Sequence, residues 1–132
     1  MKRAIGQQGV ALTEFAIILP IILILVFSLW EFGRVFDAWL VVTNAAREGA
    51  RYAVALDDTN EVRQKVQEYI SNGYGSRIGL AGDIQSYNIT VNDPGSGPVS
   101  VTVTADVKIY APLEFVGITG PIRVTGYAVM RQ

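Results

Sequence analysis

The chain has 132 residues, of which 50% are hydrophobic, and a formal net charge of −1, which gives no support to a nucleic-acid-binding role. It contains no cysteine and no histidine, so disulfides, thiol chemistry and histidine-based acid–base or metal chemistry are excluded. Once one membrane-length apolar run is set aside, the rest suffices for a single small domain.

The apolar run extends from Val10 to Trp30, behind a short basic leader that carries Lys2 and Arg3. It has three interpretations: a cleaved secretory signal, a buried core helix and a single membrane span. The residues after Trp30 form a poor signal-peptidase site, and a core helix does not need about twenty apolar residues on all faces. A single span is favoured, and the positive-inside rule places the N-terminus in the cytoplasm.

Glu14 stands near the start of this run, five residues after Gly9. A carboxylate in a membrane helix costs about 2.5–3.5 kcal/mol at the bilayer centre and less near an end, so we expect Glu14 to have a partner. Pro20 lies in the same helix, where its missing N–H favours a kink or local unwinding. Whether that bend acts as a hinge or is a fixed kink stays open.

The helical pattern continues beyond Trp30, because apolar residues recur at spacings of three and four. Glu31, Arg34 and Asp37 are expected to begin a polar face, with the flanking tryptophan side chains near the lipid headgroups. Small residues then stack along one side, which lets another backbone approach closely: Ala45, Ala46, Gly49, Ala50 and Ala53. We predict one helix from about Val10 to Leu56, roughly 70 Å long.

Beyond this helix the chain turns, and Asp58 with Glu61 resembles a capping box. A short helix is predicted from about Asn60 to Ser71, with an apolar side made of Val62, Val66, Tyr69 and Ile70. Simple capping is favoured over a calcium loop, because the ligand spacing and the central glycine of such a loop are missing. A flexible, glycine-rich connection follows, and it is not a phosphate loop: Gly73, Gly75, Gly79 and Gly82.

The C-terminal part alternates apolar and polar residues, which is typical of strands. We predict strands at 87–91, 99–109 and 122–130, with a hairpin loop at 94–98 between the first two. One apolar face is shared by Val99, Val101, Val103, Ala105, Val107 and Ile109. This face must cover the outer half of the long helix. The predicted fold is α+β: a long N-terminal transmembrane and stalk helix that packs under an antiparallel sheet of three or four strands.

The stretch GVALTEF resembles a type IV prepilin processing site: a glycine, four residues, and a carboxylate followed by the aromatic Phe15. Together with EFAIILPIILIL and NAAREGARYAV, it resembles the TadE-like family of minor pilins or pseudopilins from tight-adherence pilus systems. The resemblance covers the first half of the chain, whereas the C-terminal sheet matches in general character alone. It implies a pilin-like fold.

The resemblance also implies that Gly9 is the last leader residue and that a membrane prepilin peptidase cuts before Val10. Glu14 of one subunit would then neutralise the Val10 amine of a neighbour within an apolar helix bundle, and this pairing would fix the subunit register. In a plain anchor, Glu14 would instead snorkel to the headgroups. Three parts follow: a leader peptide at 1–9, a transmembrane and stalk helix at 10–56, and an extracytoplasmic head at 57–132.

The segment NAAREGAR has two interpretations. Small residues and alternating charges at helical spacing are typical of a helix against its own sheet, with Arg47 and Arg51 solvated, and we favour this for stability. By the family resemblance, Ala46, Gly49 and Ala50 would instead pack against another subunit, and one of the two arginines would pair with an acidic group there.

An enzyme is not expected, because serines such as Ser76 and Ser100 have no histidine partner and the chain has little room for a cleft. We also expect neither cofactor nor metal. The resemblance implies a minor pilin or pseudopilin that enters, or primes, a tight-adherence pilus used in surface attachment. The resemblance further implies that the main filament subunit of such systems is much shorter and mostly helix, so the length of this chain argues against that role.

The partners that the resemblance implies are other pilin subunits, a prepilin peptidase, the inner-membrane assembly platform and the lipid bilayer. The protein would lie in the cytoplasmic membrane with its N-terminus inside and reach the extracellular pilus after assembly. The alternative is a single-span, membrane-anchored accessory or binding domain that is neither processed nor assembled into a filament.

Overall fold

The computed structural model describes residues 2–56, 58–75, 84–95, 97–110, 117 and 119–131, with side chains described at 9–56, 58–72 and in the later ranges. The elements follow in the order α1 (Lys2–Ala55), α2 (Thr59–Gly75), β1 (Ile84–Asn92), β2 (Pro98–Val107) and β3 (Ile122–Arg131). The three strands form one antiparallel sheet in the order β1-β2-β3. The predicted α+β fold, a long apolar helix with a small antiparallel sheet, is confirmed.

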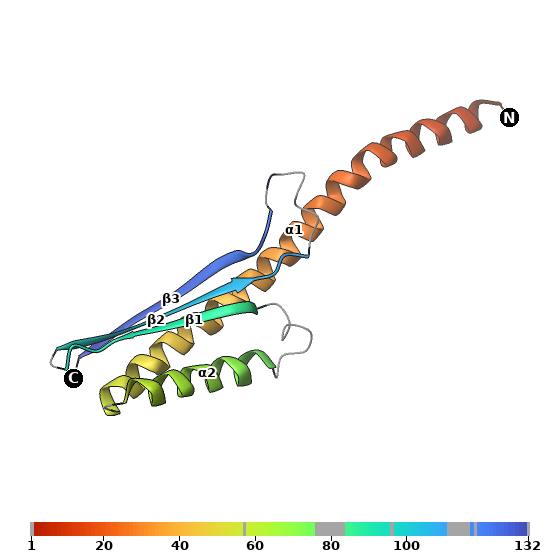
Figure 1. Ribbon diagram of the computed structural model, residues 1–132. Coiled ribbons are helices and arrows are strands. Elements are labelled where there is room, and N and C mark those ends of the chain that lie inside the picture. The colour runs from red at the N-terminus through yellow and green to blue at the C-terminus, as the bar shows by residue number, and fades with distance from the viewer. Residues whose placement is uncertain are drawn as a thin grey trace.

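The helix α1 is continuous over 54 residues, which corresponds to about 80 Å at 1.5 Å per residue. Its N-terminal part projects away from the rest, while the sheet and α2 lie along its C-terminal part (Figure 1). It begins at Lys2, earlier than the sequence suggested, so Gly9 and Val10 lie inside the helix. The helix passes through Pro20 without a break.

The core lies between the inner face of the sheet and the two helices. The predicted apolar face of the middle strand is confirmed over β2, whose alternate residues from Val99 to Val107 are buried. Ile109 lies beyond the end of β2 and is half-buried. The helices contribute small and β-branched side chains to this core: Ala38, Val42, Ala45, Ala46, Ala50 and Ala53 from α1, with Val62, Val66 and Ile70 from α2.

The sheet approaches α1 most closely at Gly126 of β3. A Cβ atom at this position would lie 2.4 Å from the carbonyl oxygen of Val42 and 2.7 Å from the Cα of Thr43. A second close approach occurs at Gly49 of α1, where a Cβ would lie 2.5 Å from Cγ2 of Val66 and 3.1 Å from Cγ1 of Val101. Both glycines are therefore required by packing inside this chain.

The predicted hairpin between the first two strands is present. Gly95 and Gly97 have φ angles of 74° and 123°, which side chains of L-residues rarely allow. The Gly95 N–H also donates a 2.8 Å hydrogen bond to Oδ1 of Asp93.

The second helix begins where the predicted capping residue, Asp58, placed its start. Oδ1 of Asp58 accepts a 2.8 Å hydrogen bond from the Asn60 N–H, so Asp58 caps α2. The expectation that Tyr69 belongs to the apolar side is wrong, because this side chain is 39% exposed. Gly79, Gly82 and Ser76 lie outside the described residues.

Candidate functional site

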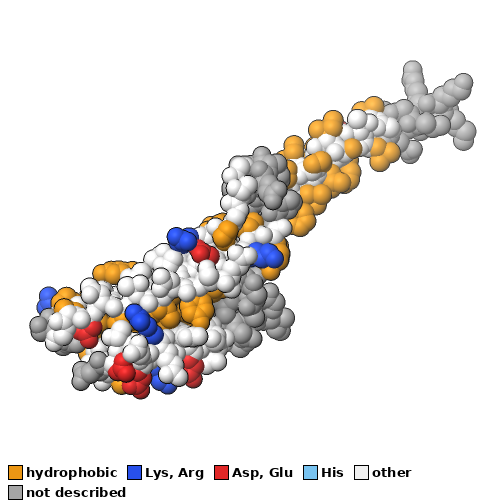
Figure 2. Space-filling view, in the orientation of Figure 1, with side chains coloured by type: hydrophobic (Ala, Val, Ile, Leu, Met, Phe, Trp, Pro, Cys, Tyr) orange, Lys and Arg blue, Asp and Glu red, His pale blue; other side chains and the backbone are white. Residues whose placement is uncertain are grey.

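The segment Val10–Trp30 of α1 is left uncovered by the parts of the chain that the structure describes. All its side chains are exposed except the half-buried Ser28; Val10, for example, is 68% exposed. Figure 2 shows hydrophobic side chains along the projecting helix, away from the head. The helix is long and apolar enough to cross a membrane, with a mean hydropathy of 2.8 in its most apolar window. An exposed apolar surface of this length calls for a cover that the described residues do not supply.

The residues of the predicted processing site occupy the N-terminal end of this segment. Gly9, Val10 and Glu14 line one side of the helix together with Thr13 and Ile17. Oγ1 of Thr13 donates a 2.9 Å hydrogen bond to the Gly9 carbonyl. Among the residues that the structure describes, no ion pair involves Glu14. A Cβ at Gly9 would meet nothing within 4 Å, so the fold of this chain does not require a glycine there.

Phe15 and Pro20 are also exposed on the projecting helix. Further along, three aromatic side chains continue the exposed apolar surface beyond Trp30. The rings of Phe32 and Phe36 are stacked with centroids 6.1 Å apart, and those of Phe36 and Trp39 are 5.6 Å apart. This aromatic row extends the uncovered surface of α1 toward the head.

The small-residue strip lies against the chain's own sheet and α2. Ala46, Gly49 and Ala50 are buried there, which agrees with the intramolecular interpretation and leaves them no surface for another subunit in this conformation. Arg47 is exposed. Arg51 is 63% exposed and donates a 3.1 Å hydrogen bond from Nε to Oε2 of Glu48. This hydrogen bond is the main reason why the pKa of Glu48 lies below its usual value.

The expectation that Glu31 and Arg34 begin a polar face is wrong, because both side chains are buried. Glu31 is 2% exposed and Arg34 is 6% exposed, and Nη1 of Arg34 lies 2.8 Å from Oε1 of Glu31. Residues 108–110, which follow β2, lie against this turn of the helix and hydrogen-bond both side chains. Two buried charges in this position are tolerable because they are paired and hydrogen-bonded.

The segment at 108–110 supplies further partners of this ion pair. Nη2 of Arg34 donates to the Lys108 carbonyl over 3.3 Å, and the Tyr110 N–H donates to Oε2 of Glu31 over 3.4 Å. The Arg34 guanidinium also lies 4.4 Å from the ring centroid of Tyr110 and 5.1 Å from that of Trp30. The spacing of Glu31 and Arg34 permits a helical i,i+3 pair, but nothing in the sequence pointed to residues 108–110.

Within the described residues, no group of three or more acidic side chains is placed to hold a metal ion. The described residues offer surfaces for association: an uncovered apolar helix, a carboxylate near its end, and a head attached by a buried ion pair.

Residues 9–51 match the family model described as TadE-like protein, which covers about a third of the 132 residues. No curated protein and no solved structure matches the chain. The matched part contains Gly9, Glu14, the apolar segment and most of the small-residue strip. This family is associated with tight-adherence pili and is structural rather than catalytic. The resemblance drawn from the residues is confirmed over residues 9–51, which are similar to TadE-like proteins.

Proposed function

We propose that the protein is a minor pilin or pseudopilin that enters, or primes the assembly of, a tight-adherence pilus through α1. The observation that carries this proposal is the segment Val10–Trp30, which is uncovered on all sides while the inner face of the head is buried. An apolar surface of this length is stable only in lipid or against other apolar helices. A pilin helix occupies both environments in turn, first the membrane and then the filament.

Leader removal would create the partner that Glu14 lacks among the described residues. Cleavage after Gly9 gives Val10 a positively charged amine at the start of the helix, where the helix dipole also favours a nearby carboxylate. In an apolar bundle, the amine of one subunit and the Glu14 carboxylate of its neighbour neutralise each other. Pairing of this kind fixes the axial position of one helix relative to the next.

The positive charges of Lys2 and Arg3 support a membrane orientation with the N-terminus in the cytoplasm and the head outside. A prepilin peptidase and the inner-membrane assembly platform would then act on the N-terminal part of α1. The aromatic row of Phe32, Phe36 and Trp39 would extend the contact between neighbouring subunits above the bilayer. The head remains exposed on the pilus, which suits a role in surface attachment.

The test is the intact mass and N-terminal sequence of the protein, taken from membranes and from sheared surface material. A chain that begins at Val10 and occurs in the sheared fraction supports the proposal. We expect the Gly9→Leu variant to keep its leader, so that its chain still begins at residue 1. We expect the Glu14→Leu variant to be absent from the sheared fraction.

Gly33→Leu is the matched control, since Gly33 lies on the same helix and its Cβ position is equally open. It should be processed at the normal position. A wild-type chain that begins at Met1 and stays in the membrane would overturn the proposal, and an anchored accessory domain would then be the better description.

A further inference from the structure

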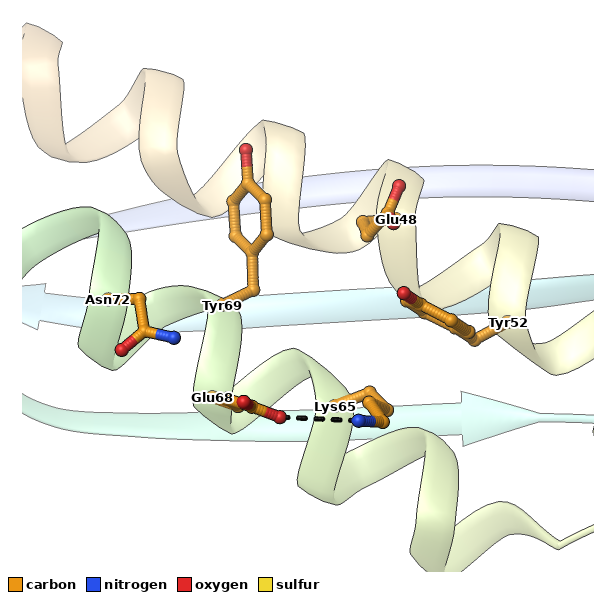
Figure 3. A pocket seen from close by; sticks show the side chains of 6 residues that line it. All are labelled: Glu48, Tyr52, Lys65, Glu68, Tyr69 and Asn72. Carbon is orange, nitrogen blue, oxygen red and sulfur yellow. Dashed lines mark hydrogen bonds and ion pairs between the residues drawn. The ribbon is translucent and has the colours of Figure 1, made fainter.

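A groove of about 440 Å³ lies between α1 and α2, well away from the apolar segment. The side chains that line it are Glu48 and Tyr52 from α1, with Lys65, Glu68, Tyr69 and Asn72 from α2. Figure 3 shows these side chains in front of the helices, with the strands behind them. The volume falls within the range of about 300–1,000 Å³ that is usual for small-molecule sites.

The charges around the groove balance one another. Arg51 neutralises Glu48 through two hydrogen bonds from its guanidinium. Nζ of Lys65 lies 3.4 Å from Oε2 of Glu68 on the next turn of α2. Two positive charges offset two negative ones, so these residues carry no excess charge to attract a charged ligand, and the groove favours an uncharged one.

The lining also offers many hydrogen-bonding groups on a rigid support. Carboxylates accept, an ammonium donates, and the Asn72 amide and the tyrosine hydroxyls do both. The Glu48 carboxylate remains ionised, and therefore an acceptor, because Arg51 lowers its pKa. A purely apolar ligand would displace water from the lining without replacing its hydrogen bonds, at a cost of about 1–3 kcal/mol for each polar group left unsatisfied.

Two aromatic rings complete the groove. Tyr52 is half-buried and packs against the core, so its ring is held in place, while Tyr69 reaches from α2 toward α1 (Figure 3). Tyr69 is one of the exposed tyrosines of the chain, which makes its ring available for stacking. Tyrosine combines an apolar ring with a polar hydroxyl, so one side chain can contact both the C–H face and the hydroxyl groups of a ligand.

We propose that this groove binds an uncharged sugar unit. A pyranose has hydroxyl groups that both donate and accept, carries no net charge, and presents an apolar C–H face that stacks on aromatic rings. These properties match the balanced charges, the polar lining and the two tyrosines. The site lies apart from the uncovered segment Val10–Trp30 of α1, so the proposal does not depend on processing or assembly.

The test uses the full chain in phospholipid nanodiscs, because sugar-headed detergents would compete for the groove. The probes are the methyl glycosides of glucose, galactose, mannose and N-acetylglucosamine, titrated by ligand-observed NMR. We expect at least one of them to bind, and Tyr69→Ala to weaken that binding by about tenfold or more. A rise in salt from about 50 to about 500 mM should leave the affinity within about twofold, because the ligand is uncharged.

Tyr127→Ala is the matched control, since Tyr127 is an exposed tyrosine on β3 and lies outside the groove; it should bind as the wild type does. If Tyr69→Ala fails to fold, Asn72→Ala replaces it, because Asn72 is exposed and its removal leaves the core intact. Binding of none of the four glycosides overturns the proposal. So do equal losses in the Tyr69 and Tyr127 variants, or an affinity that falls steeply with salt. None of these results bears on the N-terminal processing of the chain.

Discussion

Arg34 donates a 2.8 Å hydrogen bond from Nη1 to Oε1 of Glu31, and both side chains are buried where α1 meets residues 108–110. Glu31 directly follows Trp30, the last residue of the uncovered apolar segment. The covered part of α1 therefore begins with a desolvated ion pair. This pair joins the end of the apolar segment to a part of the chain more than seventy residues away.

Arg34→Ala should destabilise the head by about 3–5 kcal/mol, because it leaves the Glu31 carboxylate buried without its counter-charge. The measurement is thermal or urea unfolding of the full chain in nanodiscs, followed by circular dichroism. Arg47→Ala is the control, since Arg47 is exposed on the same helix; it should change stability by no more than about 0.5 kcal/mol.

Replacing both partners by apolar residues, Glu31→Leu with Arg34→Met, should recover most of the stability lost in Arg34→Ala, because no charge then remains buried. A single Arg34→Ala variant as stable as the Arg47→Ala control would show that the ion pair is not important for the attachment of the head.

Gly126→Ala should unfold or strongly destabilise the head, by about 1–3 kcal/mol or more, because the new Cβ would collide with the backbone of Val42 and Thr43. Gly33→Ala should instead stabilise the protein, because the Cβ position at Gly33 is open and alanine favours a helix over glycine by about 1 kcal/mol. The urea midpoints of the two variants, measured side by side, test both statements. Equal midpoints would contradict the close approach of β3 to α1.

Gly49→Leu should abolish folding and pilus assembly together, since the leucine side chain would enter the space of Val66 and Val101. Arg47→Glu should leave the head folded, because this position is exposed. The two variants are compared by circular dichroism and by recovery in sheared surface material. A folded Gly49→Leu head that fails to assemble would instead place the small-residue strip at an interface between subunits.

The stability of the sheet should depend on pH in the acid range, through the Asp106 carboxylate. Hydrogen bonds from Arg123, and then from Ser86, hold the pKa of Asp106 below its usual value. A folded-state pKa that is lower than the unfolded one stabilises the fold above the unfolded value, and this contribution is lost as pH falls through the folded pKa.

The difference in melting temperature between the wild type and Asp106→Asn should therefore be small but constant near neutral pH, and it should shrink below about pH 4. Added salt should reduce it, because the pair is exposed. Thermal unfolding from pH 7 to pH 2, at low and high salt, measures this. A difference that grows on acidification would contradict the assignment.

The sequence allowed the elements and their faces to be predicted, because their signals are local. The period of two in residues 99–107 predicted both β2 and its buried side, and the helical spacing predicted that α1 continues past Trp30. The sequence also showed a carboxylate, Glu14, in an apolar segment five residues after Gly9. The family match at residues 9–51 includes both positions.

What could not be predicted depends on contacts between distant parts of the chain. Glu31 and Arg34 look like surface residues in any helical projection, and only the position of residues 108–110 makes them buried. Likewise, Gly126 gives no local signal beyond a glycine in a strand, although it allows β3 to lie against the backbone of α1. Tyr69 has apolar spacing on α2, but it lies at the groove between the helices, where there is room for an exposed ring.

The continuous helix α1 also determines how the molecule would respond to a pulling force. The strands run alongside its C-terminal part, so tension applied at the N-terminal end enters the head as shear between the helix and the sheet (Figure 1). In shear, the packing along the helix and the ion pair at Glu31 resist the load together, rather than one contact after another. A subunit pulled in this way would keep the shape of its head, because the load is shared along the whole contact between helix and sheet.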